Sequence, residues 1–264
     1  MSATTGLGRT IGGNRYRAAA AYLVASALVA SLAFALIRFI WYPDALFEQF
    51  GGMQLFLLIA GVDIVLGPLI VFIIFVPGKK GLAFDLMVIA LLQVSALSYG
   101  VWVLYESRPV YLVFVKDRFE LVRANHLPEV EIARAKGSPF ADLPLSGPKA
   151  VGARMPADPA EVQRLTLAAA QGVDLHFFPR YYVAFDQVRN DVRGFAKPIA
   201  RLRPLNPGAT AEIDALVANL GKGKGEAGLA FLPIRAGKID LTAIVDASNG
   251  DVLRIAALRP WEYK

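Results

Sequence analysis

Two acids lie within the apolar runs of the N-terminal region, Asp63 and Asp85. Two carboxylates that share a proton can hydrolyse peptide bonds, but only when they lie side by side. Asp63 is deep inside one apolar run, whereas Asp85 is near the start of the next run. Their depths along the two helices therefore differ by about 10 residues, or ~15 Å of helix rise. This separation excludes a protease site built on these two acids.

Other residue types that support catalysis or metal binding are also poorly placed. His126 and His176 are the only histidines, and neither has a second ligand at the spacing of a metal site. The chain has no cysteine, which excludes disulfides and thiolate ligands. In Gly221–Gly225 a Gly-Lys pair is followed by Gly225, where a phosphate-binding loop needs Ser or Thr, so a linker is expected. We therefore expect no catalytic residue, no cofactor and no metal, and the chain is not expected to be an enzyme.

The net charge of +6 is the remaining feature that could indicate nucleic-acid binding. From residue 106 onward, however, 22 Lys and Arg residues are mixed with 18 Asp and Glu residues. A nucleic-acid surface would gather its basic residues on one element, with aromatic residues between them. We therefore expect an ordinary solvated surface and no nucleic-acid partner.

Three apolar runs are the elements that must position Asp63. They cover residues 18–41, 53–76 and 82–105. Each is long enough to cross a hydrocarbon core of about 30 Å as a helix. Residues 1–17 are small, polar and basic, and we expect them to form a cytoplasmic tail. A cleaved signal peptide is the rival interpretation of the first run, because residues 33–35 fit a cleavage site. The run continues to Ile40, which favours an uncleaved anchor.

The basic residues near these runs predict their orientation. Five of them flank the runs on one side: Arg9, Arg15, Arg17, Lys79 and Lys80. The loop of residues 42–52, on the other side, contains no Lys or Arg. Because positive residues favour the cytoplasmic side, the N-terminus is expected in the cytoplasm and residues 106–264 outside it. Trp41 and Tyr42 are expected as aromatic anchors at the membrane surface.

Asp63 is expected to face polar groups of the third run. Asp63 and Ser95 each lie 13 residues from the cytoplasmic end of their run, and Gln93 lies two residues less deep, so these groups can hydrogen-bond. Pro68 cannot donate to the carbonyl group of Ile64, which leaves an acceptor near the acid. Asp63, Gly67, Pro68 and Gln93 thus form a candidate site with three possible roles. It could be a packing device within the molecule, a contact for a partner helix, or part of a proton or ion relay.

The turn between the second and third runs is expected at the membrane surface. It reads Pro77-Gly78-Lys79-Lys80-Gly81, and Asp85 follows in the first turn of the next helix. We expect Asp85 to cap this helix or to pair with Lys79 or Lys80.

Residues 106–264 predict an α+β domain with antiparallel strands. The alternation of apolar residues predicts a strand pair at 110–115 and 119–123, followed near the C-terminus by a meander at 229–234, 238–246 and 251–258. Helices are predicted at 129–136, at 209–220 and from Asp158 to Gln171. In the last of these, Asp158 caps the helix, Pro159 fits its first position, and Glu161 is expected to reach back to its start.

Four aromatic residues follow the helix that Asp158 caps: Phe177, Phe178, Tyr181 and Tyr182. Such a cluster either packs in the core or against the membrane surface, or offers a contact face to a partner. Phe178, Tyr181 and Tyr182 are therefore candidates for contact with another protein.

Several short segments carry a family resemblance. They are Gly61-Val62-Asp63, Leu66-Gly67-Pro68, Pro77-Gly78-Lys79-Lys80-Gly81, Phe84-Asp85, Leu91-Leu92-Gln93, Tyr99-Gly100-Val101, Arg108-Pro109-Val110, Asp117-Arg118-Phe119 and Leu258-Arg259-Pro260-Trp261. On these segments the chain resembles the TfpX/TfpZ family of type IV pilin accessory proteins, to which the fimbrial assembly protein FimB is related. The resemblance runs from about residue 16 to the C-terminus and is weakest between residues 127 and 150.

The resemblance implies a protein of the bacterial inner membrane, with a periplasmic C-terminal domain, that supports assembly or surface display of one type IV pilin. The expected partners are that pilin, membrane lipid and the inner-membrane pilus machinery, and the expected mode is chaperone-like contact. The family has no established catalytic residues. A proton-coupled transport component or another subunit of an envelope complex is the alternative, and it would require more buried ionisable groups than the single acid Asp63.

Overall fold

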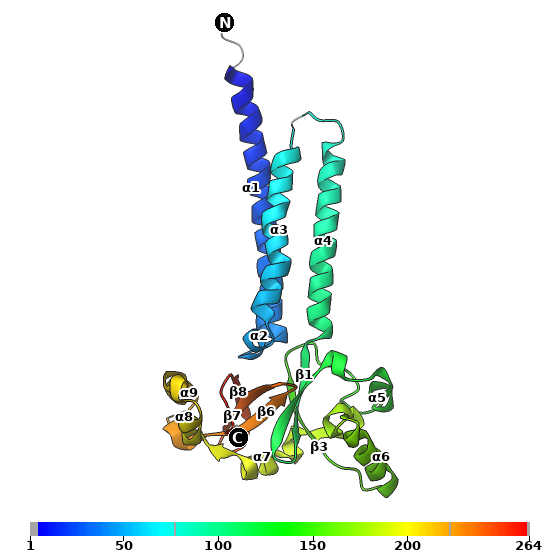
Figure 1. The fold of residues 1–264 in the computed structure, drawn as a ribbon, viewed down its shortest axis with the longest axis vertical. Coiled ribbons are helices and arrows are strands. Elements are labelled where there is room, and N and C mark those ends of the chain that lie inside the picture. Colours follow the sequence, from blue (N-terminus) through cyan, green and yellow to red (C-terminus); the bar gives the residue numbers. More distant parts are fainter. Residues whose placement is uncertain (1–4, 77, 222, 263–264) are drawn as a thin grey trace. The chain divides into compact units, whose positions relative to one another are not determined.

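A computed structural model describes the chain over residues 5–76, 78–221 and 223–262 (Figure 1). Residues 1–4 of the predicted tail, Pro77 of the predicted turn and Lys222 of the predicted linker lie outside the described residues. The chain forms two compact units. The helical unit comprises Met1–Phe39 and Phe50–Tyr105, and the sheet unit comprises Ile40–Gln49 and Glu106–Lys264.

Three long helices confirm the prediction that the three apolar runs are helical. They are α1 (Thr5–Ala35), which continues as a π-helical segment η1 (Leu36–Trp41), α3 (Gly52–Ile74) and α4 (Leu82–Glu106). Stretches of 27, 23 and 25 residues in these helices are long and apolar enough to cross a membrane. Pro68 lies inside α3 without ending it. The helical structure of α1 begins at Thr5, so it extends into the segment predicted as a tail.

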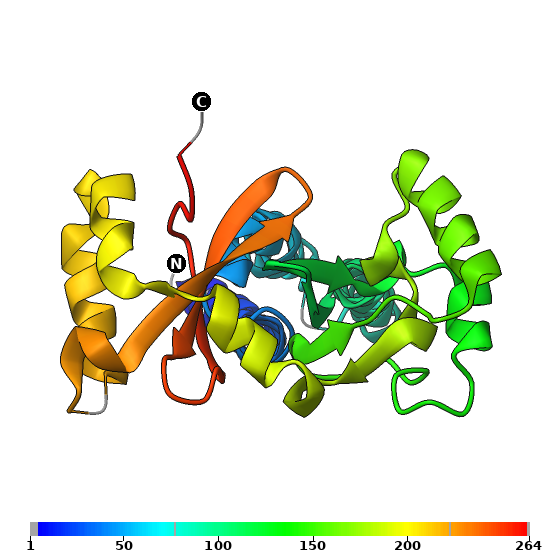
Figure 2. The same cartoon turned by 90° about the horizontal axis from the view of Figure 1, so that it is seen from below.

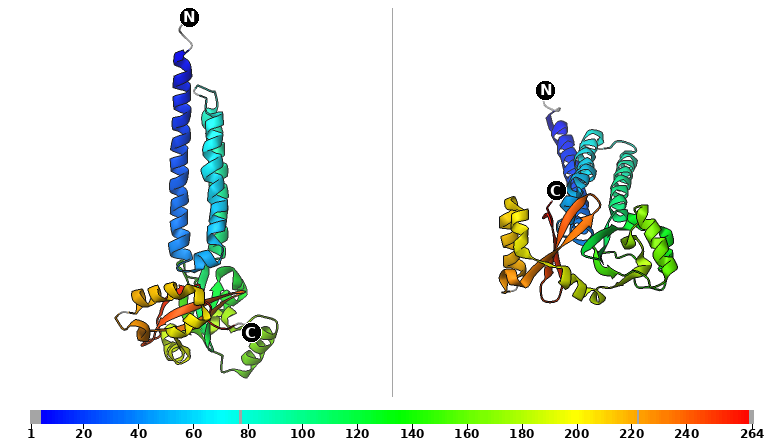
Figure 3. Two further views of the ribbon diagram at one scale, coloured as in Figure 1. Left: turned by 60° about the vertical axis from the view of Figure 1, so that its left-hand side comes forward. Right: turned by 60° about the horizontal axis from the view of Figure 1, so that its bottom comes forward.

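Helices α1 and α3 pack side by side and run antiparallel (Figure 3). The ring of Tyr16 lies 5.2 Å from that of Phe72, and the ring of Phe34 lies 5.0 Å from that of Phe56. Ala30, Ala60 and Val71 are buried between the helices, where two of the three side chains are small enough for a close approach of the backbones. Helix α4 is less enclosed, because only Gly100 and Leu104 of its residues are buried.

The sheet unit contains a mixed sheet of eight strands. They are β1 (Pro109–Val115), β2 (Arg118–Arg123), β3 (Lys149–Ala153), β4 (Tyr182–Ala184), β5 (Lys197–Pro198), β6 (Leu229–Ala236), β7 (Ile239–Asp246) and β8 (Val252–Ala256). Their order is β4-β3-β1-β2-β6-β7-β8, with β5 paired to β6. The predicted hairpin β1–β2 and meander β6–β7–β8 are confirmed.

The prediction of antiparallel strands is confirmed only in part, because the sheet is mixed. Strand β3 pairs with β1 in parallel, and β6 pairs with β2 in parallel through two residue pairs, Phe119–Ile234 and Glu120–Arg235. Parallel neighbours need a long crossover connection, and the alternation within one strand does not reveal which distant strand will become its neighbour. Strands β4 and β5 were not expected, since they contain only three and two residues.

Short helices surround the sheet. They are α2 (Leu46–Gln49), α5 (Glu129–Arg134), α6 (Pro159–Ala170), α7 (Arg189–Phe195), α8 (Leu202–Leu205) and α9 (Thr210–Leu220). Single 3₁₀ turns are η2 (Ala124–His126), η3 (Leu175–Phe177), η4 (Pro179–Tyr181), η5 (Phe185–Gln187), η6 (Ile199–Arg201), η7 (Pro207–Ala209) and η8 (Gly225–Gly228). As predicted, Asp158 caps α6 by accepting a hydrogen bond from the amide of Ala160 at 3.0 Å.

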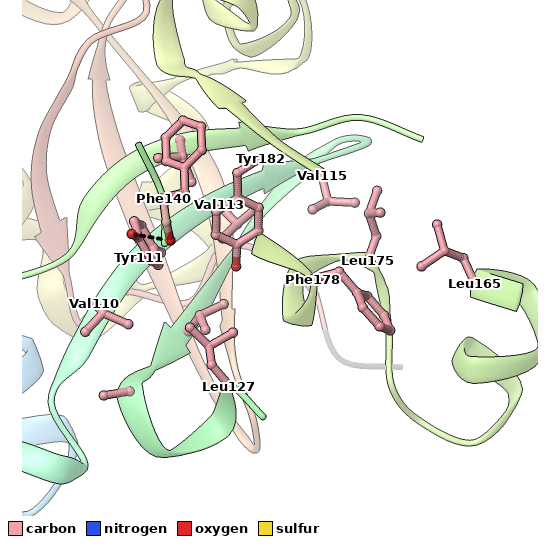
Figure 4. Close-up of a cluster of buried hydrophobic side chains, with 13 residues drawn as sticks. Val110, Tyr111, Val113, Val115, Leu127, Phe140, Leu165, Leu175, Phe178 and Tyr182 are labelled. Carbon is pink, nitrogen blue, oxygen red and sulfur yellow. Dashed lines mark hydrogen bonds between the residues drawn. The ribbon is translucent and has the colours of Figure 1, made fainter. Parts of the chain in front are cut away.

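Two hydrophobic clusters fill the sheet unit. The helices that cover them, α6 in green and α8 and α9 in yellow to orange, lie at opposite ends of the unit (Figure 2). One packs β1 and β3 against α6 and the aromatic turns η3 and η4, and includes Tyr111 and Phe140 (Figure 4). The Tyr111 hydroxyl donates to the carbonyl group of Phe140 at 3.2 Å. The other cluster packs β6 to β8 against α8 and α9, with Phe231 at 0% exposure. Only the short β2–β6 pairing links the two halves of the sheet.

The segment of residues 40–49, which connects the first two long helices, is part of the sheet unit. The amide of Ala45 donates to the carbonyl group of Ile255 in the edge strand β8 at 3.3 Å. In return, Asp44 Oδ2 accepts from the amide of Ile255 at 3.1 Å. Leu46 and Phe47 are fully buried. The segment thus covers a sheet edge that would otherwise leave backbone groups unpaired.

Trp41 and Tyr42 are buried, so the prediction that they anchor the chain in the membrane surface is wrong. The Tyr42 hydroxyl lies 3.0 Å from Ser107 Oγ within the sheet unit. The apolar run that precedes them indicated an interface, but the packing of residues 40–49 against the sheet takes both rings into the protein interior.

Candidate functional site

The polar site of the helical unit is built from one residue on each long helix. Asp63 lies midway along α3, and Gln93 lies near the middle of α4. Tyr22 comes from α1. Each helix is apolar around its polar residue, so the three side chains form an isolated polar cluster at the centre of the unit.

Two hydrogen bonds connect the three helices at this level. Gln93 Nε2 donates to the backbone carbonyl group of Asp63 at 3.4 Å. The Tyr22 hydroxyl donates to Gln93 Oε1. Gln93 therefore uses both ends of its amide to bridge α1 and α3, which satisfies polar atoms that would be costly in an apolar environment.

Gly67 makes room for this bridge. A Cβ atom at position 67 would lie 2.4 Å from Gln93 Nε2 and 2.8 Å from Cε1 of Tyr22. Real carbon atoms do not approach so closely, so any larger residue would displace Gln93 or Tyr22. Gly61, on the same helix, has no such neighbour within 4 Å.

The Asp63 carboxylate has no hydrogen-bond partner within the described part of the chain. Its residue is only 7% exposed, yet among the described residues the carboxylate makes no hydrogen bond or ion pair. It borders a pocket of about 210 Å³. The other lining residues are Tyr22, Ala25, Ser26, Val29, Ala90, Gln93, Val94 and Leu97. A group that enters this pocket could donate a hydrogen bond to Asp63, or accept one from its protonated form.

The structure brings together Asp63, Gly67 and Gln93 from the predicted site, with Pro68 next to Gly67. Ser95 does not join them, because its hydroxyl donates to the carbonyl group of Leu91 in its own helix at 2.8 Å. Tyr22 was not predicted. Tyr22 is only four residues into the first apolar run, whereas Asp63 is 13 residues from the matching end of the second run. Because α1 begins before that run, at Thr5, equal depth within the runs does not identify the residues of α1 and α3 that meet.

At the turn before α4, Lys79 Nζ lies 2.6 Å from Asp85 Oδ2, which is one of the two expected arrangements. Lys80 is exposed beside this ion pair. Both partners are more than one third exposed, so the pair contributes little to stability.

The predicted aromatic contact face is mostly core. Phe178 and Tyr182 are buried in the cluster of Figure 4, so their rings are not available to a partner. The Tyr182 hydroxyl donates to the carbonyl group of His176. Tyr181 is partly buried, and its hydroxyl donates to Glu161. Glu161 therefore does not reach back to the start of α6, as expected from the sequence, but binds Tyr181 and Arg180.

A second buried acid, Glu131, lies in the sheet unit. Its side chain is 6% exposed, and Arg134 Nη1 donates to its Oε1 at 2.6 Å. Arg164 lies 3.7 Å from the same oxygen, and Arg180 lies 3.8 Å from Oε2. Glu161 pairs with Arg164 and Arg180 at 3.2 and 2.9 Å. This Arg–Glu network ties α5, α6 and η4 together.

The histidines lie near the β2–β6 pairing. His126 contacts Arg123 at 2.6 Å, and the ring of His176 lies 4.1 Å from that of Phe177. Burial lowers the pKa of His176 to about 4. Burial raises the pKa of Glu120 in β2 to about 7. Within the described ranges, no group of three or more His, Asp or Glu residues could hold a metal ion.

Relatives of the chain are named for fimbrial assembly. A fimbrial assembly protein of Dichelobacter nodosus serogroup I is 32% identical over 182 residues, which is 68% of this chain and 70% of the relative. The protein of serogroup E1 is 33% identical over 66% of this chain and 68% of the relative. The chain belongs to the fimbrial assembly protein family. A shorter member, from serogroups C1 and C2, is 35% identical over 116 residues, or 88% of its own length.

This membership confirms the family resemblance on which the sequence-based expectations depended. No family model matches the chain, and no solved structure matches it. The arrangement of residues in this chain is therefore interpreted from its own geometry.

Proposed function

We propose that this protein is an inner-membrane accessory factor that holds a specific type IV pilin during assembly or surface display, by chaperone-like contact and without a catalytic step. The names of its relatives support a role in fimbrial assembly. The open carboxylate of Asp63 is the observation that carries the proposed contact.

The cost of placing Asp63 in lipid supports a role in binding. A carboxylic acid at the centre of a membrane helix costs about 2.5–3.5 kcal/mol on insertion scales. Packing within the molecule does not offset this cost, because Gln93 bonds the backbone of Asp63 and not its carboxylate. A partner helix that donates a hydrogen bond into the pocket would satisfy the acid.

The layout of the chain fits a substrate with two zones. Pilin subunits await assembly with an apolar helix in the inner membrane and a globular head outside it. In the proposed topology, the N-terminus and Lys79–Lys80 face the cytoplasm, and the sheet unit lies in the periplasm. The helices would then contact the pilin helix while the sheet unit meets the head.

The test uses substitutions at Asp63 in pilus-bearing cells. We expect Asp63→Leu to abolish co-purification of pilin and to lower surface pili, because the pocket loses its polar group. Asp63→Asn, which keeps hydrogen-bonding capacity, should retain part of both. The matched control is Asp85→Asn, which changes an exposed acid outside the pocket. Undiminished pilin capture by Asp63→Leu, at equal protein level, would remove Asp63 from the mechanism.

A second pair of variants tests the shape of the site. Gly67→Ala places a methyl group against Gln93 and Tyr22, whereas Gly61→Ala places the same group in open space. We expect pilin capture to fall in Gly67→Ala and to be unchanged in Gly61→Ala. Equal capture by both variants would show that the bridge between the helices does not matter for the partner.

Proton-coupled transport remains the alternative that the same variants address. Proton pathways need several ionisable groups across the membrane, and Asp63 is the only acid among the middle residues of the three candidate spans. A proton flux in vesicles that is lost in Asp63→Asn would favour this alternative over the pilin-holding role.

A further inference from the structure

The loop of residues 143–147, here called the Leu145 loop, is fixed to the two points where the chain leaves its candidate spans. The amide of Gly147 donates to the carbonyl group of Ile40 at 2.5 Å. Ile40 lies within the candidate span that ends at Trp41. On the other side of the loop, Arg108 Nε donates to the carbonyl group of Pro144 at 3.2 Å. Arg108 follows the end of the third candidate span, Glu106, by two residues.

Close packing reinforces the first of these attachments. A Cβ atom at Gly147 would lie 2.6 Å from Cγ of Pro43 and 3.3 Å from the carbonyl oxygen of Ile40. Only glycine therefore allows the loop to lie against residues 40–43. Leu143, at the other end of the loop, packs partly against the hydrophobic cluster of β1 and β3.

Between these attachments, Leu145 is exposed. Its side chain is 68% exposed, although a leucine gains by leaving water. Single exposed leucines are common on soluble surfaces and need no explanation. Leu145 differs because it lies within two residues of both attachments, or about 7 Å along the chain. The headgroup layer on each side of a bilayer is of similar thickness, roughly 5–8 Å.

We infer that the Leu145 loop lies in the headgroup layer of the membrane and inserts Leu145 among the lipids. The inference rests on the proposed membrane placement of the helices. Trp41 and Tyr42 are buried and cannot contact the lipid headgroups. Leu145 would provide an apolar contact with the headgroup layer in their place. The lipid contact would add to the two attachments that hold the loop beside residues 40 and 108.

Fluorescent labelling of single-cysteine variants tests this placement. The chain has no cysteine, so Leu145→Cys in the full-length protein carries the label at one position. The labelled protein is placed in vesicles that contain lipids with a quencher near the headgroup or deep in the acyl chain. Leu28→Cys, at the middle of the first candidate span, is the positive control. Leu167→Cys is the negative control, since its side chain is also exposed, at 62%.

The position of Leu167 makes it a matched control. It lies on α6, whose residues Leu165, Thr166 and Ala169 line a pocket with Val115 and Lys116 at the end of β1. Strand β1 begins at Pro109 and covers seven residues. Leu167 therefore lies near the end of β1 that is about 20 Å from the membrane-proximal end.

We expect the shallow quencher to reduce the fluorescence of label at Leu145 strongly, the deep quencher to reduce that at Leu28, and neither to affect Leu167. Quenching at Leu28 without quenching at Leu145 would overturn the inference and leave the membrane placement intact. Absence of quenching at all three positions would overturn the proposal that the three helices lie in the membrane. Equal shallow quenching at Leu145 and Leu167 would also overturn the inference, because the label alone would then be binding lipid. Since no pilin is present, these results are independent of the proposed pilin contact.

Discussion

Both units bury one acid, but they treat it in opposite ways. Glu131 in the sheet unit lies within 4 Å of three arginines. Asp63 in the helical unit borders a pocket, and its carboxylate has no partner among the described residues. A buried acid that is paired holds elements together, whereas one without a hydrogen-bond partner carries a desolvation cost that a bound partner would lower. The comparison separates a structural acid from a candidate functional one.

The largest effect is expected at Glu131. Replacing it with Ala removes the buried carboxylate that three arginines share; these arginine side chains are 20–47% exposed, so we expect a cost of about 3 kcal/mol. We expect the unfolding midpoint of the sheet unit in the full-length, detergent-solubilised protein to fall by on the order of 10 °C. The control is Glu129→Ala on the exposed side of the same helix, with an expected change below about 1 kcal/mol. Equal midpoints for the two variants would show that the Arg–Glu network does not stabilise the unit.

Replacing Asp63 should have a favourable effect, in contrast to the destabilisation expected at Glu131. Replacing Asp63 with Leu removes a carboxylic acid from the middle of an apolar helix, so membrane insertion of α3 should become more favourable by about 2.5–3.5 kcal/mol. An insertion assay on the α3 segment measures this change. Asp85→Leu in the α4 segment should gain less, because Asp85 lies in the first turn of its helix. If the Asp63→Leu segment inserted less efficiently than the wild-type segment, this result would contradict the interpretation that the Asp63 carboxylic acid is a cost to the apolar helix.

Asp44 is an intermediate case, because its partners are a backbone amide and one arginine. Asp44→Ala leaves the amide of Ile255 without its acceptor, which should cost about 1–3 kcal/mol of unfolding free energy. Asp44→Asn retains an acceptor oxygen and tolerates the positive φ of 55° at this position, so it should cost less. Unfolding of both variants, followed by intrinsic fluorescence, provides the comparison. If Asn is as harmful as Ala, the ion pair with Arg254 at 3.5 Å carries the effect instead.

The smallest effect is a pH dependence near the β2–β6 pairing. The folded-state pKa of Glu120, about 7, lies above its ordinary value of 4.5, so the folded state binds the extra proton and stability falls as pH rises from 4.5 to 7. The pKa of His176, about 4, lies below its ordinary 6.5, so stability rises between pH 4 and 6.5. The two effects oppose each other between pH 4.5 and 6.5. Glu120→Gln should therefore make stability rise with pH more steeply in this window than in the wild type, as measured by unfolding midpoints. An unchanged slope would contradict the pKa of Glu120.

Local signals predicted much of the fold. The apolar runs predicted three helices, the alternation around Lys116 predicted the β1–β2 hairpin, and Asp158-Pro159 predicted the start of α6. These elements follow from interactions between residues close in sequence. The parallel pairings of β3 and β6 depend on distant segments, and no local pattern identifies a distant neighbour.

The candidate site was predicted in part for the same reason. Asp63, Gly67 and Gln93 could be grouped, because α3 and α4 are joined by a short turn that determines their relative depth. Tyr22 could not, since the register of α1 against α3 is set by side-chain packing such as that of Tyr16 on Phe72. The burial of Phe178 and Tyr182 was left open by the sequence, because aromatic residues suit both a core and a contact face.

The pairing of residues 44 and 45 with β8 has a consequence for how the protein is made. The bond from Ile255 to Asp44 closes a contact across 211 positions. During synthesis, Asp44 emerges 211 residues before its partner Ile255. Contacts of such long range form slowly, because the ends of a long loop must first meet. The segment that carries Leu46 and Phe47 must therefore wait for its partner until strand β8 has been synthesised.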